Sequence, residues 1–461
     1  MLQSSRILSY FWFAAAVVFL LYSISVTLQL GNPHLMPDEW LVVRSFLENG
    51  PFETLFTPQN GHLQTFPYAF HYVNWTFIKH SQWPLVWTGY VLSFVLLGLL
   101  FRVIWFDQSL RNHERILVAS TLVIYFYWMG NGFILLVGNE SIHCFLVLGS
   151  LFVAILAFFD LNSSATDSRG PRNMLIIILA SFVAACSFGA GLVLSPTIFA
   201  LAIIFRARPS VLLQLFCVMV ATATVYYGAA GSTGEGIEPD VLFTSDFYLR
   251  ALRWISAPVL AISGIRVPWD DFQAVSGGWL LDSRALYVVY AITILSLGYV
   301  GTHCIQVWRG KRFPGKTSMM LAGTAIAMIG VGVLVTLLRS AFQEAYPQDV
   351  FSYRYYVWSS LYWFSFVGLL WVNSARGGLL SQSTALVSAS VCLIYLCTSN
   401  GFWAKNAWLP IRQSHDLTAE FLYLDISPNR LSYHVLRFFL GLESGEMVQI
   451  AQSMRAEGIP V

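Results

Sequence analysis

Long runs of apolar residues, separated by short polar stretches, constrain this chain more than any other feature. The first run, from Ser9 to Leu30, contains no charged residue. It is about as long as the ~20 residues that a helix needs to cross a bilayer. Only 11% of the 461 residues are charged, whereas soluble proteins carry about 25%. The sequence therefore predicts an all-α polytopic membrane protein.

The apolar runs predict about eleven transmembrane helices. Their expected ranges are 9–30, 84–106, 115–130, 141–159, 174–189, 191–205, 210–229, 285–307, 317–338, 356–372 and 382–399. The fifth and sixth are short and share the break Phe188-Gly189-Ala190-Gly191, which indicates either a tight helical hairpin or an interrupted helix. We expect residues 1–400 to form the transmembrane domain and residues 401–461 to form a small helical segment.

The distribution of basic residues predicts the orientation. Short loops on one side carry most of them, and the positive-inside rule places these loops and the N-terminus in the cytoplasm. The long segments 31–83, 230–284, 339–355 and everything after 400, including the C-terminus, then lie outside, so the chemistry is expected there. The basic residues assigned to the inside are Arg6, Arg102, Arg111, Arg115, Arg169, Arg172, Arg206, Arg208, Arg309, Lys311, Arg312, Lys316 and Arg376.

Other function classes find little support. A net charge of +2 gives no reason to expect a nucleic-acid partner. The six cysteines lie within apolar runs, and none forms a CxxC pair. A transporter would show an internal repeat and charges at mid-membrane in both halves, but Glu140 is the one acid expected at depth.

The first outer loop begins with the pair Asp38-Glu39, directly after Pro37, which is a favourable helix start. A helix is predicted over residues 38–48, and a second follows the turn at residues 57–62. Both are amphipathic enough to lie on the outer leaflet. The first would place Trp40, Val43, Phe46 and Leu47 on one face, and the second Leu63, Phe66, Phe70, Val73 and Phe77. His62, His71 and His80 are nine residues apart and alternate between opposite sides of a helix, which argues against a three-histidine metal site.

These features resemble the GT-C superfamily of membrane glycosyltransferases, in which an acid at the exit of the first helix precedes a long loop with two flat helices. Residues Phe56-Thr57-Pro58-Gln59-Asn60-Gly61-His62, with Phe66-Pro67, resemble a Pro-His-Asn-Glu-His-Arg segment of some bacterial members. Here Gln59 replaces the first His, Gly61 the Glu and Leu63 the Arg. Looser matches are Gly130-Asn131-Gly132 to Gly138-Asn139-Glu140, Ser187-Phe188-Gly189-Ala190-Gly191 to Pro196, and Ser352-Tyr353-Arg354-Tyr355.

The resemblance implies an inverting hexosyl- or pentosyltransferase in the bacterial cytoplasmic membrane. Its donor would be a polyprenyl-phosphate-linked sugar, and its acceptor a cell-surface glycan, a lipid-linked glycan or a protein. An acid of the first outer loop would act as general base, with Asp38 as the first choice and Glu39 as the second. Both also suit a helix N-terminus without any catalytic role.

The leaving lipid phosphate would need positive charge. Arg339 and Arg354 lie at outer helix ends, against the positive-inside bias, and a guanidinium offers fork geometry to phosphate oxygens. Snorkelling or pairing with a nearby acid is the alternative. Arg253 belongs to a second outer cluster of basic residues, for which a solvated face is the more ordinary interpretation.

Asn60, His62, Glu140 and Trp40 are the candidate substrate-binding residues. An ordinary polar turn, a helix cap and an interfacial tryptophan are their alternative interpretations. No metal site and no cofactor are expected, although some diphosphate-using relatives need a divalent cation. The identity of the sugar and of the acceptor stays open.

Three further functions remain open, one of them a scaffold without chemistry whose aromatic outer loops bind a partner. The chain could be an O-antigen polymerase or ligase, or a protein glycan transferase, with a lipid-diphosphate donor and without need of the first-loop acid. It could also be a flippase for lipid-linked sugars. Substitution of Asp38 or Glu39 discriminates among these functions.

Overall fold

The computed structural model describes residues 2–31, 37–58, 62–78, 81–163, 170–230, 239–262, 283–310, 315–345 and 355–374, with residues 387, 390, 393–394, 396–401, 403–405 and 412. Within these ranges every element is a helix. Six helices are long and apolar enough to cross a membrane, at Ile7–Leu30, Trp83–Phe106, Gly138–Asn162, Pro209–Ala229, Tyr287–Trp308 and Lys316–Leu338. The chain is therefore a multi-pass helical membrane protein, as its apolar runs predict.

The remaining predicted spans differ in form. The third is a bent pair, Asn112–Phe126 and Met129–Leu136, with an angle of 43° between its parts. The fifth and sixth are the shorter helices α8 (Gly170–Ala185) and α9 (Leu194–Ile204). The tenth is α15 (Tyr356–Ser374), and the eleventh falls largely outside the described residues. The count of eleven spans thus stays a prediction.

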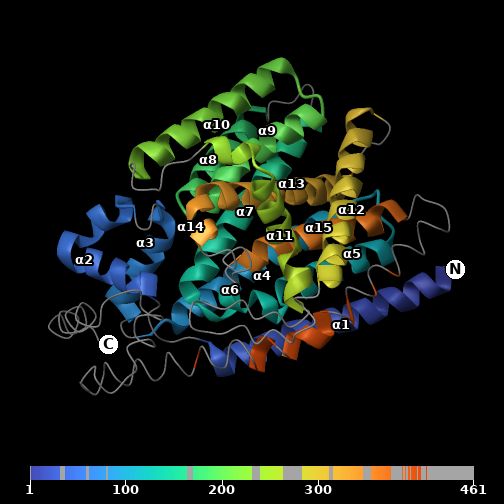
Figure 1. The fold of residues 1–461 in the computed structure, drawn as a ribbon, viewed down its shortest axis with the longest axis horizontal. Coiled ribbons are helices and arrows are strands. Elements are labelled where there is room, and N and C mark those ends of the chain that lie inside the picture. The colour runs from blue at the N-terminus through green and yellow to red at the C-terminus, as the bar shows by residue number, and fades with distance from the viewer. Residues whose placement is uncertain are drawn as a thin grey trace.

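Helix α7 (Gly138–Ser163) lies at the centre of the bundle (Figure 1). It packs against α4 (Trp83–Phe106), α8 and α13 (Lys316–Leu338). Around this core, α1 (Leu2–Leu30) lies along α5 (Asn112–Phe126), and α15 packs between α13 and α5. The other described helices are α6 (Gly132–Leu136), α10 (Pro209–Ala230), α11 (Ser245–Ile262), α12 (Ser283–Trp308) and α14 (Ser340–Ala345).

The first loop contains the two helices that its sequence predicts. Helix α2 (Pro37–Phe56) starts at Pro37 and continues past residue 48, across a kink at Gly50, which has a φ of +77° and precedes Pro51. Helix α3 (Thr65–Val73) continues as a π-helical turn, Asn74–Ile78. Large apolar side chains remain exposed on this loop, among them Phe52 at 78% and Phe77 at 77%. An outer leaflet would cover such side chains, so contact with the membrane stays the prediction for this loop.

The two ends of the bundle differ in character. At one end, which we call the basic end, Lys316 pairs with Asp160 at 2.8 Å, and the Arg206 guanidinium lies 5.1 Å from the centre of the Trp308 ring. Helices α4, α7, α9 and α12 finish there, and α5 and α13 begin there. The first loop, the start of α7 and the end of α13 lie at the opposite end, which is the arrangement that the positive-inside rule requires. Which end faces the cytoplasm stays a prediction.

Candidate active site

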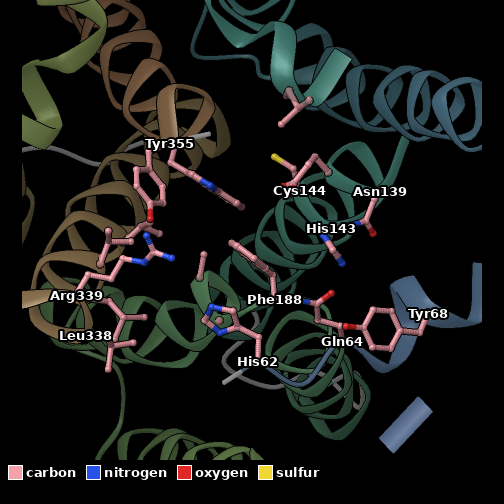
Figure 2. Close-up of a pocket in the computed structure, with 18 of the residues that line it drawn as sticks. His62, Gln64, Tyr68, Asn139, His143, Cys144, Phe188, Leu338, Arg339 and Tyr355 are labelled. Atoms are coloured by element: carbon pink, nitrogen blue, oxygen red, sulfur yellow. The ribbon is translucent and has the colours of Figure 1, made fainter. Parts of the chain in front are cut away.

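A cavity of about 300 Å³ lies at the end opposite the basic end, where the first loop meets the helices. Its lining comes from the first loop, the start of α7, the turn between α8 and α9, the end of α13 and the start of α15. Figure 2 shows Arg339 and Tyr355 on one side of this cavity, Asn139 and His143 on the other, and His62 between them. Segments that are far apart in sequence therefore converge on one space.

The turn between α8 and α9 forms one wall. The chain leaves α8 near Ala185, passes through the 3-10 turn Gly189–Val193 and returns along α9. A Cβ atom on Gly191 would lie 2.0 Å from the Ala184 carbonyl oxygen, and one on Gly189 would lie 2.7 Å from His62 Nδ1. The two glycines thus permit a sharp return beside the cavity. Of the two predicted forms, the helical hairpin is the one present.

His62 is held against this wall. Its Nδ1 lies 3.1 Å from the Tyr226 hydroxyl, and its ring lies 5.3 Å from the Phe188 ring, measured between centroids. The side chain is half-buried and lines the cavity. The predicted turn residue therefore faces the cavity, while its role stays a prediction.

Glu39 lies in a buried polar cluster beside the cavity. Its side chain is 1% exposed, and its Oε1 lies 3.9 Å from His71 Nε2. His71 Nε2 donates to Asn139 Oδ1 at 2.7 Å. Burial lowers the pKa of His71 to about 4, more than the hydrogen bond to Asn139 raises it. The ring is thus neutral at neutral pH, and its contact with Glu39 is not an ion pair.

Two ionisable residues project from the first turns of α7 into the cavity. Glu140 is half-buried and is the carboxylate among the described lining residues. His143 follows three residues later on the same helix face, 3% exposed, and its ring lies 5.6 Å from that of Phe188 with 20° between the planes. Neither ring nitrogen of His143 has a hydrogen-bond partner among the described residues. A buried imidazole without partners is costly, which suggests that a ligand supplies them.

Arg339 brings positive charge to the opposite side of the cavity. It follows the last residue of α13, is half-buried, and its guanidinium carbon lies 6.0 Å from the centre of the Tyr355 ring. The last turns of α13 add an apolar strip beside it, made of Val331, Leu334, Val335 and Leu338. A guanidinium at the end of an apolar strip suits an anionic head group attached to a hydrocarbon chain.

The other predicted site residues are not all brought to this cavity. Arg253, in α11, donates from Nε to the Tyr290 hydroxyl at 3.1 Å and is not part of the lining. Asn60 and Arg354 lie outside the described residues. Asp38 and Trp40 lie in the first turn of α2, and their side chains are also outside what is described. Residues 413–461 of the predicted C-terminal helical segment also lie outside the described residues.

The sequence did not single out His143 as a site residue, and Asn139 entered only through the Gly138-Asn139-Glu140 match and as a possible helix cap. The sequence does contain a pattern that indicates His143, because the Glu-x-x-His spacing of Glu140 and His143 at the start of a helix places both side chains on one face. No group of three or more His, Cys, Asp or Glu side chains is close enough to hold a metal ion within the described part of the chain. Arg339, His62 and Glu140 were predicted, and all three line the cavity.

No family model and no curated protein sequence matches this chain. Among solved structures it is similar to the archaeal oligosaccharyltransferase AglB from Archaeoglobus fulgidus, in complex with an inhibitory peptide and a dolichol-phosphate. The two chains share 13% sequence identity, and the TM-score is 0.44. The match covers 94% of this chain and 59% of the archaeal chain, so the present chain spans little more than half of that protein.

Proposed function

We propose that this protein is an inverting membrane glycosyltransferase. It moves a sugar from a polyprenyl-phosphate donor to a surface glycan, a lipid-linked glycan or a protein, on the outer side of a bacterial cytoplasmic membrane. The observation that carries the proposal is the cavity itself, which combines a guanidinium at the end of an apolar strip with a carboxylate and imidazoles on the opposite side. The guanidinium suits the leaving phosphate, and the polar side chains opposite it suit the sugar and its acceptor.

The first-loop acid supplies the base in this mechanism. A carboxylate takes the proton of the acceptor hydroxyl as its oxygen bonds to the anomeric carbon. The bond from that carbon to the phosphate oxygen breaks, and its electron pair leaves with the lipid phosphate. Attack from the face opposite the leaving group inverts the configuration.

We assign this base to Asp38. The burial of Glu39 beside His71 and Asn139 gives Glu39 a positioning role, in which it holds the start of α2 against α7. Glu140 is the rival base, because its side chain lines the cavity directly. The two candidates lie on different elements, so single substitutions separate them.

Arg339 receives the lipid phosphate, and the apolar strip of α13 guides the first part of the donor lipid. Guanidinium hydrogen bonds to phosphate strengthen as negative charge develops on the leaving oxygen, which favours the transition state over the bound donor. Arg354, just before Tyr355, is proposed as a second phosphate ligand.

A comparison of surface glycans by mass spectrometry tests this function. A deletion strain is compared with complements that carry the wild-type gene, Asp38→Asn or Glu140→Gln at matched protein abundance. Loss of one defined sugar in the deletion and in one point variant supports the proposal. A glycan of altered chain length, restored by both variants, would instead indicate a polymerase or a flippase.

A further inference from the structure

A second cavity, of about 490 Å³, lies between α1, α4 and α5, toward the basic end of the bundle. Several side chains of its lining are exposed, including Phe13 at 57% and Trp105 at 56%, so the groove opens on the outside of the bundle. From Arg115 to Val123, helix α5 rises about 12 Å along it. This length approaches half of the ~30 Å hydrocarbon core, so the groove is long enough to accompany an acyl chain through most of one leaflet.

Two arginines interrupt an otherwise almost wholly apolar lining. Arg102 lies in the last turns of α4 and Arg115 in the first turn of α5, and both line the groove. The remaining lining residues are apolar except Ser120. Positive charge is thus confined to the part of the groove nearest the water.

Neither arginine forms an ion pair with a carboxylate among the described residues. Arg115 donates from Nη1 to Asn112 Oδ1 at 3.1 Å and from Nη2 to the Asp107 carbonyl oxygen at 2.9 Å, and both acceptors are neutral. Its Nε is buried without a partner within the described ranges. Arg102 is exposed and has no carboxylate within 4.0 Å among the described residues.

Two other cations at the same end, Arg111 and Lys316, are paired. Arg111 donates from Nε to Glu114 at 2.6 Å, and Lys316 pairs with Asp160 at 2.8 Å. The Asp107 carboxylate is used by backbone donors, since it accepts from the N–H groups of Ser109 and Thr317. Burial raises the pKa of Asp107, but these hydrogen bonds outweigh burial and leave it below its ordinary value. This carboxylate is therefore ionised at neutral pH, and both of its oxygens already accept hydrogen bonds from the backbone.

We propose that this groove is a binding site for an anionic bilayer phospholipid. One acyl chain lies between α1, α4 and α5, and the lipid phosphate accepts hydrogen bonds from Arg102 and Arg115. The two arginines suit the phosphate of such a lipid, and the apolar groove suits its acyl chain. Basic sites between transmembrane helices select anionic head groups.

The glycosyl donor is a less suitable occupant. Its proposed phosphate ligand, Arg339, follows the end of α13, whereas the groove opens beside the start of α5, at the basic end. Helix α4 has 24 residues and joins the two ends, a rise of about 36 Å. A donor head group at one end cannot reach the other, so the groove serves a lipid of the opposite leaflet, and its role does not rest on the proposed transfer reaction.

Native mass spectrometry of the full-length protein in detergent tests this site. Phosphatidylglycerol and phosphatidylcholine with identical acyl chains are titrated separately, and bound lipid is counted. Two arginines near a lipid phosphate predict a preference for phosphatidylglycerol of about 10- to 30-fold. The double variant Arg102→Gln with Arg115→Gln should bind both lipids equally, and Arg102→Gln alone, which disturbs no described hydrogen bond, should lose part of the preference.

Two further variants locate the site. The double variant Arg172→Gln with Arg309→Gln removes two exposed charges of the same end that are not in the lining, and it should keep the full preference. Ala119→Phe fills the groove without touching charge and should reduce phosphatidylglycerol binding. Equal binding of the two lipids by the wild type would overturn the proposal, and so would an equal loss in both double variants. Stronger binding of polyprenyl phosphate than of phosphatidylglycerol would also overturn it.

Discussion

His71 Nε2 donates a hydrogen bond of 2.7 Å to Asn139 Oδ1, and this contact joins the first loop to the start of the central helix α7. Both side chains are buried, and Glu39 lies beside them. Because α2, α3 and α7 meet at these polar groups, the cluster fixes where the first loop sits relative to the cavity. The placement of the proposed base therefore depends on this cluster, of which Asn139 lines the cavity while Glu39 and His71 lie behind it.

This cluster predicts a pH-dependent stability. The pKa of His71 is about 4 in the folded protein, against 6.5 for an ordinary histidine. Above pH 6.5 the ring is neutral in both states, whereas between 6.5 and 4 only the unfolded chain takes up the proton. The free energy of unfolding should decrease by up to about 3 kcal/mol as the pH falls through this window.

Thermal unfolding of the purified protein between pH 7 and pH 4 measures this decrease. His71→Gln keeps a donor for Asn139 but cannot titrate, so its melting temperature should fall less over the same range. An identical pH profile for the wild type and the variant would show that His71 does not carry the effect.

Arg339 should be needed for the donor but not for the fold. Arg339→Gln removes the guanidinium of the cavity, and losing a charge-assisted contact to phosphate should raise the KM for the donor by about 10- to 100-fold. Arg253→Gln is the matched control, because Arg253 bonds to Tyr290 outside the lining. Steady-state kinetics with a water-soluble short-chain donor measures both. A similar KM increase in the two variants would argue against a specific phosphate site.

The turn between α8 and α9 should tolerate no side chain at Gly191. A Cβ there would lie 2.0 Å from the Ala184 carbonyl oxygen, and backbone cannot move aside as a flexible side chain can. Gly191→Ala should lower the stability by about 2 kcal/mol or more. Gly149→Ala, in α7 with no atom within 4 Å of the added carbon, should be neutral or stabilise by about 0.5–1 kcal/mol. Melting temperatures in detergent compare the two, and equal values would contradict the assigned packing.

His143 should be more important for activity than for stability. Both ring nitrogens lack a hydrogen-bond partner among the described residues, while the ring packs on Phe188. His143→Phe keeps the packing and removes two unsatisfied groups, so the melting temperature should rise or stay unchanged. Transfer activity should fall by about 10-fold or more, because a substrate hydroxyl loses its partner. Full activity in this variant would exclude His143 from substrate binding.

Much of this arrangement could be predicted from composition and local pattern. The first apolar run and the acid pair after Pro37 were sufficient to place the end of α1 and the start of α2 to within one residue, whereas α1 begins at Leu2, before the predicted start at residue 9. Helix length is fixed by bilayer thickness, and helix starts are fixed by proline and acidic residues, so both are local properties.

The cavity depends on contacts between distant segments, and local pattern could not predict it. The burial of Glu39 follows from α7 packing behind the first loop, and the choice between a hairpin and an interrupted helix follows from the return of α9 along α8. The groove between α1, α4 and α5 could not be predicted either, because in the sequence Arg102 and Arg115 are two ordinary members of the set of basic residues assigned to the inside. Only the residues around them in the folded structure distinguish them from Arg111, which forms an ion pair with Glu114.

The most direct test of the central claim is the rate of sugar transfer by purified Asp38→Asn, measured with a polyprenyl-phosphate sugar beside Glu39→Gln and Glu140→Gln. If Asp38 is the base, its loss should lower kcat by about 100-fold or more while donor binding is kept. Glu39→Gln should act mainly through stability, and Glu140→Gln should retain substantial activity. A wild-type rate in Asp38→Asn, with activity abolished in Glu140→Gln, would contradict this assignment and move the base to the start of α7.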